Sequence, residues 1–361
     1  MRRGDIDWVR VVALFLLIIY HTSIAFMPFG PKVFFITNDE YLEILWIPMS
    51  LLNIWRIPIL FMVSGMGVYF AIKKRGPRQL LVDRTLRILI PLIFGFFFIC
   101  PINSYFYQLS IGEGLTYSPN IGHLWFLGNI FIYVVIFMPV FFYFKTNLQN
   151  IFMRGLSCLF KYKLGITFLG LATMVEGILV NPQNGFASYA YTTHGFFLGM
   201  ICFFFGFCFV CSGKVFWEAI ENARGLNLII ASCIYVHRMY ILVFYHSGDF
   251  IWHNGLESMC WMLAIFGYAS KYLNKNSHML KYLSRAVYPV YIIHMPVQYC
   301  LSHLIFGLNI SPISKLFFLN AGIFGISFIF FEIIKKLRWI RPLFGLKFNL
   351  KDEETTRTQK A

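Results

Sequence analysis

Long apolar runs separated by short polar connections make up most of this sequence. Many of the runs approach the roughly 20 residues that an α-helix needs to cross the hydrocarbon core of a bilayer. We place them at 8–29, 44–71, 88–107, 123–144, 164–181, 195–212, 226–246, 254–271, 286–306 and 314–335. The pattern therefore predicts an all-α polytopic membrane protein with about ten transmembrane helices.

The basic residues between these runs alternate from one connection to the next. Connections after the even-numbered runs, and the C-terminal segment, are basic: Lys73, Lys74, Arg75, Arg78, Arg84, Arg87, Lys145, Arg154, Lys161, Lys163, Lys214, Arg224, Lys271, Lys275, Lys281, Arg285, Lys335, Lys336, Arg338, Arg341 and Lys347. The odd-numbered connections hold few basic residues, chiefly Lys32, and the stretch 181–194 has no charge. Because cytoplasmic loops are enriched in Lys and Arg, we expect both termini in the cytoplasm.

Composition supports the membrane class. The chain has 361 residues, of which 58% are hydrophobic and 13% are charged. A soluble domain of this length cannot bury so much apolar surface. The net charge of +15 does not indicate a nucleic-acid partner, because the basic residues lie in short loops and no nucleic-acid motif accompanies them. We expect one membrane-embedded domain at 1–345 in a lipid bilayer, followed by a short polar cytoplasmic tail at 346–361.

The N-terminus and the cysteines add two negative expectations. A basic start followed by an apolar run is similar to a signal peptide. However, Arg10 interrupts the beginning of the apolar run, and no clear small-residue cleavage site follows His21. We therefore expect an uncleaved helix. Cys208 and Cys211 have CxxC spacing without a partner pair, which argues against a redox or zinc role. The histidines show no i, i+4 pair within a run, so no metal site is expected.

Arg10 and His21 lie within the first apolar run, 8–29. Their separation of 11 positions is about 1,100° of helical rotation, which places both side chains on one stripe of a helix. Ionisable residues inside a membrane segment indicate a functional site. The alternative is that Arg10 extends to cytoplasmic headgroups while His21 bonds a neighbouring helix.

Three arginines also interrupt the apolar pattern. Arg56 lies near the middle of the run 44–71, a depth at which extension of the side chain to the headgroups is a poor explanation for an arginine. The alternative to a functional role is an ion pair with a buried carboxylate. Arg84 and Arg87 precede Pro91 at the cytoplasmic start of the run 88–107. They are either topology signals or bidentate ligands for phosphate.

Further candidates lie in the later runs. His123 and Trp125 begin the run 123–144 at its non-cytoplasmic end, where an interfacial aromatic belt is the alternative to a functional role. His294 lies about halfway along its run, before Pro296, and such a proline frees backbone groups that need internal partners. Three carboxylates are candidate counter-charges, with pairings left open: Glu176, Glu257 and Glu332.

These residues favour chemistry by side chains inside the membrane. A histidine suits proton removal from a hydroxyl, because its pKa lies near working pH. No Gly-x-Ser-x-Gly elbow or glycine-rich phosphate loop occurs in the sequence. The rival interpretation is a transporter or flippase for a polysaccharide or a lipid-linked sugar, which the lack of an obvious internal repeat weakens. A structural or sensory membrane protein is the third interpretation.

The order of several short motifs resembles the acyltransferase-3 family of integral membrane acyltransferases across about the whole chain. The matching elements are Asp7-x-x-Arg10 with His21, Phe61-x-x-Ser64-Gly65, Arg84-x-x-Arg87 before Pro91, His123-Leu-Trp125-Phe-Leu127, Pro289 to Pro296 with His294, and Glu332 with Arg341-Pro-Leu-Phe-Gly345. The last element is similar to that of a member that adds acyl groups such as succinyl to periplasmic glucans.

The resemblance implies transfer of an acetyl or succinyl group from cytoplasmic acyl-CoA to a sugar hydroxyl on the other face of a bacterial inner membrane. It implies no permanently bound cofactor, with acyl-CoA as donor substrate and a carbohydrate as acceptor. The implied catalytic residues are Asp7, Arg10 and His21, with His21 as base or as a transient acyl carrier. Arg10, Arg84 and Arg87 are implied to hold CoA, and His123, Trp125, His294 and Glu332 to contact the acceptor or the carbonyl. We expect Arg56 to bind the thioester oxyanion or the free carboxylate of a succinyl donor.

Overall fold

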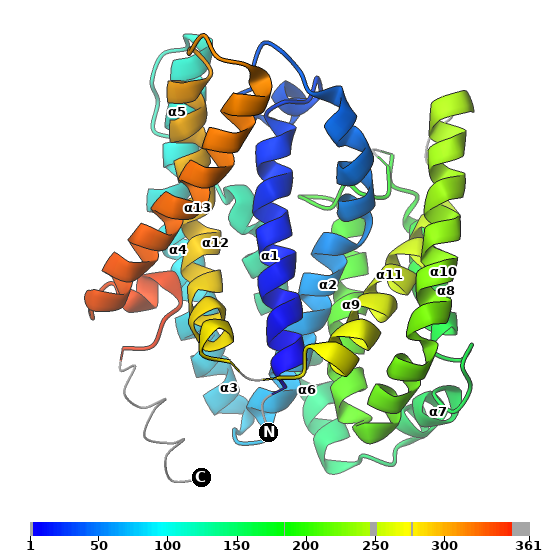
Figure 1. Ribbon diagram of the computed structural model, residues 1–361. Helices are drawn as coiled ribbons and strands as arrows, with labels where there is room; N and C mark the ends of the chain where they lie inside the picture. Colours follow the sequence, from blue (N-terminus) through cyan, green and yellow to red (C-terminus); the bar gives the residue numbers. More distant parts are fainter. Residues whose placement is uncertain (1–2, 184, 246–250, 276, 349–361) are drawn as a thin grey trace. The chain divides into compact units, whose positions relative to one another are not determined.

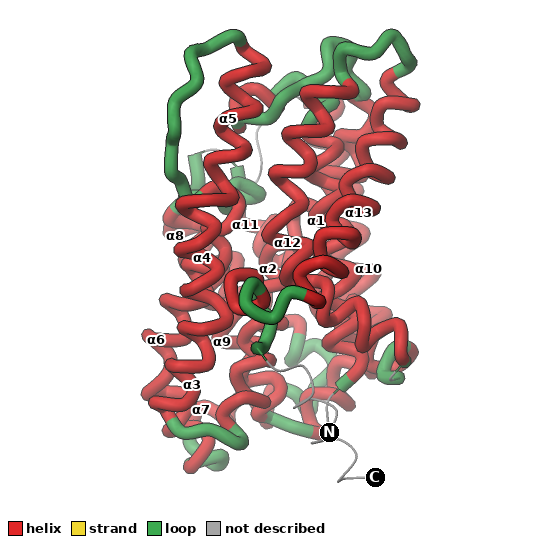
Figure 2. Tube along the Cα trace, turned by 90° about the vertical axis from the view of Figure 1, so that its left-hand side faces the viewer, coloured by secondary structure: helices red, strands yellow, loops and turns green. Residues whose placement is uncertain are grey.

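The computed structural model describes residues 3–183, 185–245, 251–275 and 277–348 (Figure 1). The longer helices are α1 (Gly4–Ile24), α2 (Trp46–Ile72), α5 (Cys100–Ile111), α6 (Trp125–Thr146), α8 (Gly170–Val180), α9 (Thr193–Cys211), α10 (Lys214–Tyr245), α11 (Ile251–Tyr272), α12 (His278–Ile305) and α13 (Pro312–Lys336). The shorter ones are α3 (Pro77–Arg84), α4 (Ile90–Phe94), α7 (Ile151–Leu159) and the 3₁₀ or π segments η1 (Gly30–Val33), η2 (Glu43–Leu45), η3 (Thr85–Leu89), η4 (Gly95–Ile99), η5 (Gly122–Leu124), η6 (Thr167–Leu169) and η7 (Arg341–Phe344). Figure 2 shows helices and loops and, in the described part of the chain, no strand.

The predicted fold class is confirmed: the protein is an all-α polytopic membrane protein. Each apolar run falls on helix, and 7 helical segments within the described residues are long and apolar enough to cross a membrane. The segment Thr167–Val180 is apolar but shorter. The total of about ten spans and the cytoplasmic termini stay predictions.

Helix α1 differs from its predicted bounds. It begins at Gly4 and ends at Ile24, whereas the apolar run continues to residue 29. The chain turns at Thr22–Phe26 through short-range hydrogen bonds, and Pro28 follows. A residue before proline is disfavoured in the α conformation, so hydrophobicity alone overestimates the length of this helix.

The chain divides into two units. Unit 1 comprises Met1–Tyr20, Trp46–Leu80 and Ile132–Lys281, and unit 2 comprises His21–Leu45, Leu81–Phe131 and Tyr282–Ala361. Helices α1, α3, α6 and α12 each contribute residues to both units. The expected tail at 346–361 lies largely outside the described residues, which end at 348.

Unit 1 is held together by close helix contacts. A Cβ added at Gly65 of α2 would lie 1.9 Å from the carbonyl oxygen of Phe203 on α9, and one at Gly206 would lie 2.0 Å from the carbonyl oxygen of Met62. Small residues allow this approach of two backbones, and dispersion contacts between the helices follow from it. The rings of Phe141 and Phe207 stack at 3.7 Å between centroids in the same core.

A proline in α2 frees a carbonyl that a loop residue uses. Pro58 has no N–H, so the carbonyl of Ile54, four residues earlier, loses its helical donor. The hydroxyl of Tyr189, in the loop between α8 and α9, lies 3.0 Å from this carbonyl oxygen and 3.0 Å from that of Asn53. A buried backbone group is thereby satisfied within unit 1, as membrane burial requires.

In unit 2, the C-terminal motif packs on the segment that carries Arg87. The backbone at Gly345 has a φ of 70°, and a Cβ there would lie 2.3 Å from the ring of Tyr288 and 3.1 Å from the carbonyl oxygen of Arg87. The ring of Phe344 contacts Phe94 of α4 at 5.5 Å between centroids. Only glycine fits this conformation and this close contact without strain.

Candidate active site

A pair of histidines lies in unit 2. His21, in the last turn of α1, places its Nδ1 3.1 Å from Nε2 of His294 on α12. The two rings are nearly parallel, with an interplanar angle of 8° and centroids 5.3 Å apart. The side chain of His294 is fully buried, whereas His21 is partly exposed. The structure thus joins two of the histidines that the sequence singled out.

One backbone carbonyl determines which ring nitrogens of this pair carry a proton. Nδ1 of His294 lies 2.7 Å from the carbonyl oxygen of Tyr291, which can only accept a hydrogen bond, so this nitrogen carries a proton. In a neutral ring, Nε2 of His294 is then an acceptor, and Nδ1 of His21 donates to it. Neutral His21 consequently has the lone pair of a base on Nε2. The assignment rests on the hydrogen-bond network, which fixes histidine tautomers.

A proline explains how the third histidine is held. Pro296 cannot donate to the carbonyl of Ile292, and Nε2 of His123 lies 3.1 Å from that oxygen. The hydroxyl of Tyr291 in turn donates to the carbonyl of His123, so two hydrogen bonds join η5 to α12. The backbone group freed by the proline, predicted from sequence, therefore has a histidine as its partner.

The ring of His123 lies edge-on to that of His294, with centroids 5.2 Å apart. Since Nε2 of His123 donates to a carbonyl, its Nδ1 is the acceptor in a neutral ring. This Nδ1 is buried and has no hydrogen-bond partner among the described residues. His21, His123 and His294 thus form a cluster with two basic nitrogens, one on His21 and one on His123.

The backbone of His21 is also fixed. Its carbonyl lies in the last turn of α1, where helical donors run out, and it accepts a hydrogen bond of 2.7 Å from Nε2 of Gln298. The next residue, Thr22, donates to Oδ1 of Asn320 on α13 at 2.9 Å. The ring of Phe35 lies 5.8 Å from that of His21 between centroids. Sequence reasoning missed Gln298, although it lies one helical turn beyond His294 on the same side of α12.

The other predicted residues of unit 2 lie in three places. Trp125 begins α6, directly after the η5 turn of His123. Arg84 ends α3, and Arg87 lies in the π-helical η3, with its Nε 3.1 Å from Oδ1 of Asp83. Glu332, on α13, accepts from the hydroxyl of Tyr282 at 2.9 Å and pairs with Lys335 at 2.7 Å. No described contact joins Glu332 to the histidine cluster, and its role stays a prediction.

In unit 1, α1 carries the first part of the predicted stripe. The guanidinium of Arg10 pairs with Oδ1 of Asp7 at 3.0 Å, and its side chain is partly exposed. The continuous helix Gly4–Ile24 contains both Arg10 and His21, as the spacing predicted.

The structure answers the open question of the buried carboxylates. Glu257 binds Arg238 through two hydrogen bonds, of 2.8 and 3.0 Å, and Glu176 binds His194 at 2.9 Å. Arg238 lies within an apolar run and was missed as an intramembrane cation, and His194 was not singled out from the sequence. Within the described residues, no group of three or more His, Cys, Asp or Glu side chains could hold a metal ion.

The chain was compared with known proteins and families. Neither the curated proteins nor the solved structures gave a match. The family model described as an acyltransferase domain (Acyl_transf_3) matches residues 3–332, which is nearly the whole chain. The chain belongs to the acyltransferase-3 family of membrane acyltransferases.

Proposed function

We propose that this protein moves an acetyl or succinyl group from acyl-CoA in the cytoplasm to a hydroxyl of a periplasmic or cell-surface glucan. Family membership supports acyl transfer in a membrane. The similarity of the closing Glu332 and Arg341–Gly345 motif to glucans biosynthesis protein C supports a glucan acceptor and a bacterial inner membrane.

The observation that carries this proposal is the hydrogen-bonded His21–His294 pair. Nε2 of His21 takes the proton of the acceptor hydroxyl, and the oxygen attacks the thioester carbonyl. The C–S bond then breaks, the new ester keeps the acyl group, and the proton on His21 passes to the leaving sulfur to give free CoA. An imidazole can accept a proton in the first step and return it in the second.

His294 has a positioning role in this mechanism. Its Nδ1–H bond to the Tyr291 carbonyl fixes the tautomer, and its Nε2 then fixes the tautomer of His21. As His21 gains a proton, His294 remains a neutral acceptor that stabilises the imidazolium. Nδ1 of His123 is available to accept a hydrogen bond from a second hydroxyl of the acceptor. We propose Trp125 as the aromatic surface against which the sugar ring packs, and Glu332 as a further acceptor contact.

The donor requires cationic groups, because CoA carries phosphates. Arg84 and Arg87 lie on consecutive turns of the segment α3–η3, within the same unit as the histidines. Guanidinium groups bind phosphate oxygens in a bidentate manner. We propose that Arg10 also contacts the donor and that Asp7, which pairs with it, orients its guanidinium. No resident cofactor is needed for this chemistry, since the thioester supplies the activated acyl group.

The test adds acyl-labelled acetyl-CoA or succinyl-CoA to inside-out vesicles that contain the protein and enclose periplasmic extract. We expect label to enter the carbohydrate fraction with the wild type and to remain on CoA with His21→Ala. A transporter would instead move a carbohydrate across the membrane without any acyl transfer. Absence of labelled carbohydrate with a folded wild-type protein and both donors would contradict the proposal.

A further inference from the structure

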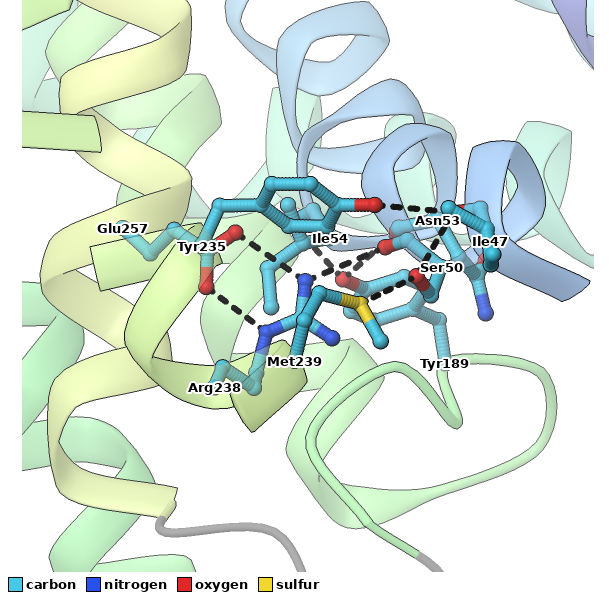
Figure 3. A network of polar contacts seen from close by, with 9 residues as sticks. All are labelled: Ile47, Ser50, Asn53, Ile54, Tyr189, Tyr235, Arg238, Met239 and Glu257. Atoms are coloured by element: carbon cyan, nitrogen blue, oxygen red, sulfur yellow. Dashed lines mark hydrogen bonds and ion pairs between the residues drawn. The ribbon is translucent and has the colours of Figure 1, made fainter. Parts of the chain in front are cut away.

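Two buried guanidinium groups in unit 1 have different surroundings. Arg56 on α2 and Arg238 on α10 are 3% and 6% exposed. Arg238 forms a bidentate ion pair with Glu257 and also donates to the carbonyl of Ser50 at 3.3 Å (Figure 3). Its charge is therefore compensated, as a cation buried in a protein requires.

Arg56 has only neutral partners among the described residues. One terminal nitrogen donates to Oδ1 of Asn53 at 3.1 Å, and the other lies 3.5 Å from the carbonyl oxygen of Leu17, at the limit of a hydrogen bond. The guanidinium lies over the ring of Tyr20, 3.7 Å from its centroid. Nε is buried with no partner. Most of the five N–H donors of this arginine thus remain available for a further acceptor.

The described carboxylates of unit 1 are bound elsewhere. Each of them contacts a different group: Asp5 contacts Arg3, Asp7 contacts Arg10, Glu176 contacts His194, Glu218 contacts Lys214, Glu221 contacts Ser270 and Glu257 contacts Arg238. The ion pair with a buried carboxylate, the alternative that the sequence left open for Arg56, is therefore not found among them.

The position of Arg56 is nevertheless fixed. Asn53 accepts from Arg56 with its Oδ1 and donates with its Nδ2 to the carbonyl of Ala187 at 3.3 Å. The hydroxyl of Tyr189 lies 3.0 Å from the carbonyl oxygens of Asn53 and Ile54. Figure 3 includes these three residues. The loop before α9 thereby holds the turn of α2 on which Asn53 and Arg56 lie. A side chain fixed in this way is preorganised for a ligand and pays little ordering entropy on binding.

We propose that Arg56 is the binding residue for a carboxylate carried by a substrate, with Asn53 orienting its guanidinium. A planar carboxylate fits the guanidinium fork through two parallel hydrogen bonds and supplies the missing negative charge. This inference rests on the proposed function and narrows its substrate class. The carboxylate belongs either to a dicarboxylic acyl donor such as succinyl-CoA or to an acidic sugar of the acceptor.

The test measures acyl transfer by wild type, Arg56→Met and Arg56→Lys. Each protein is assayed with succinyl-CoA and with acetyl-CoA as donor, and each donor is combined with a neutral glucan or with a glucan that contains uronic acid. Loss of a charge-assisted pair corresponds to about 10- to 150-fold in kcat/KM. A loss of that size confined to succinyl-CoA identifies the donor carboxylate, and one confined to the acidic acceptor identifies the acceptor. We expect Arg56→Lys to lose less than Arg56→Met, because it keeps the charge and loses the fork.

A second measurement separates binding from turnover. Succinate should raise the Tm of the purified wild type and leave that of Arg56→Met unchanged. The matched control is Arg238→Met/Glu257→Gln, which removes an equally buried guanidinium together with its counter-charge. This control should keep the succinate response.

The outcomes of the two inferences are distinguishable. The carboxylate site would be overturned if Arg56→Met lost the same factor in kcat/KM with every donor and acceptor and kept the wild-type rise in Tm with succinate. The acyltransferase proposal would still stand. A wild type that releases no CoA from either donor, but whose Tm still responds to succinate through Arg56, would overturn the proposed reaction and support the site.

Discussion

Replacing His294 with phenylalanine tests how the histidine pair works. Phe keeps a planar ring of similar size in the buried position but removes the acceptor of His21 and the donor to Tyr291. The Nδ1–H of His21 then loses this acceptor, so His294 no longer fixes the tautomer of the ring. His21 itself is retained, so the substitution separates positioning from base catalysis.

The magnitude follows from the hydrogen bonds that are lost. A donor left without its partner costs about 1–3 kcal/mol, and each 1.36 kcal/mol is tenfold in rate, so kcat should fall about 5- to 150-fold. Removal of the proposed base by His21→Ala should cost more, about 10²- to 10⁴-fold, the usual contribution of general base catalysis. His294→Gln should lie between wild type and His294→Phe, because its amide oxygen can still accept from His21.

The assay is the release of free CoA thiol as a function of pH. A protonated His21 cannot take a proton from the acceptor hydroxyl, so the proposed mechanism predicts that the wild-type rate falls on acidification. His303→Phe is the matched control, since His303 lies on the same helix and contacts Phe106 rather than the cluster. An unchanged kcat for a folded His294→Phe, or a loss as large as that of His21→Ala, would refute the positioning role.

Three further predictions concern stability, the positioning of His21 and helix packing. Arg238→Met should lower the free energy of unfolding, measured by denaturant titration, by about 3–5 kcal/mol, because the substitution removes the ion-pair partner of buried Glu257. The double variant Arg238→Met/Glu257→Gln should recover part of this loss, and no recovery would contradict the pairing. Gln298→Leu should lower kcat about 2- to 10-fold through the lost bond of about 0.5–1.5 kcal/mol to the His21 carbonyl, with KM for the donor unchanged. Gly65→Leu should lower Tm markedly, because its Cβ would overlap the Phe203 carbonyl; an unchanged Tm would contradict the close packing of α2 on α9.

Much of the fold could be predicted from sequence because the bilayer leaves few alternatives. Apolar runs of membrane length must be helical, since backbone groups in lipid need internal partners. The same rule made Pro296 informative, and His123 is the residue that satisfies the freed carbonyl of Ile292. Pro58 of α2 was equally visible in the sequence, and Tyr189 satisfies the carbonyl it frees.

The partners of the charged residues could not be predicted in the same way. Arg238 and Glu257 lie on different helices, and nothing local in either run identifies the other as its partner. Helical spacing places Arg10 and His21 on one stripe, but it says nothing about which side of α12 faces His21. Gln298 was overlooked for this reason, since its hydrogen-bond acceptor is a carbonyl at the end of another helix.

The most direct test of the central claim compares the release of CoA from succinyl-CoA and acetyl-CoA by wild type, His21→Gln and His303→Gln in inside-out vesicles with acceptor present. The account predicts CoA release by wild type and His303→Gln, and its loss by at least about 100-fold in folded His21→Gln. CoA release at the wild-type rate by His21→Gln would contradict the assignment of His21 as the base.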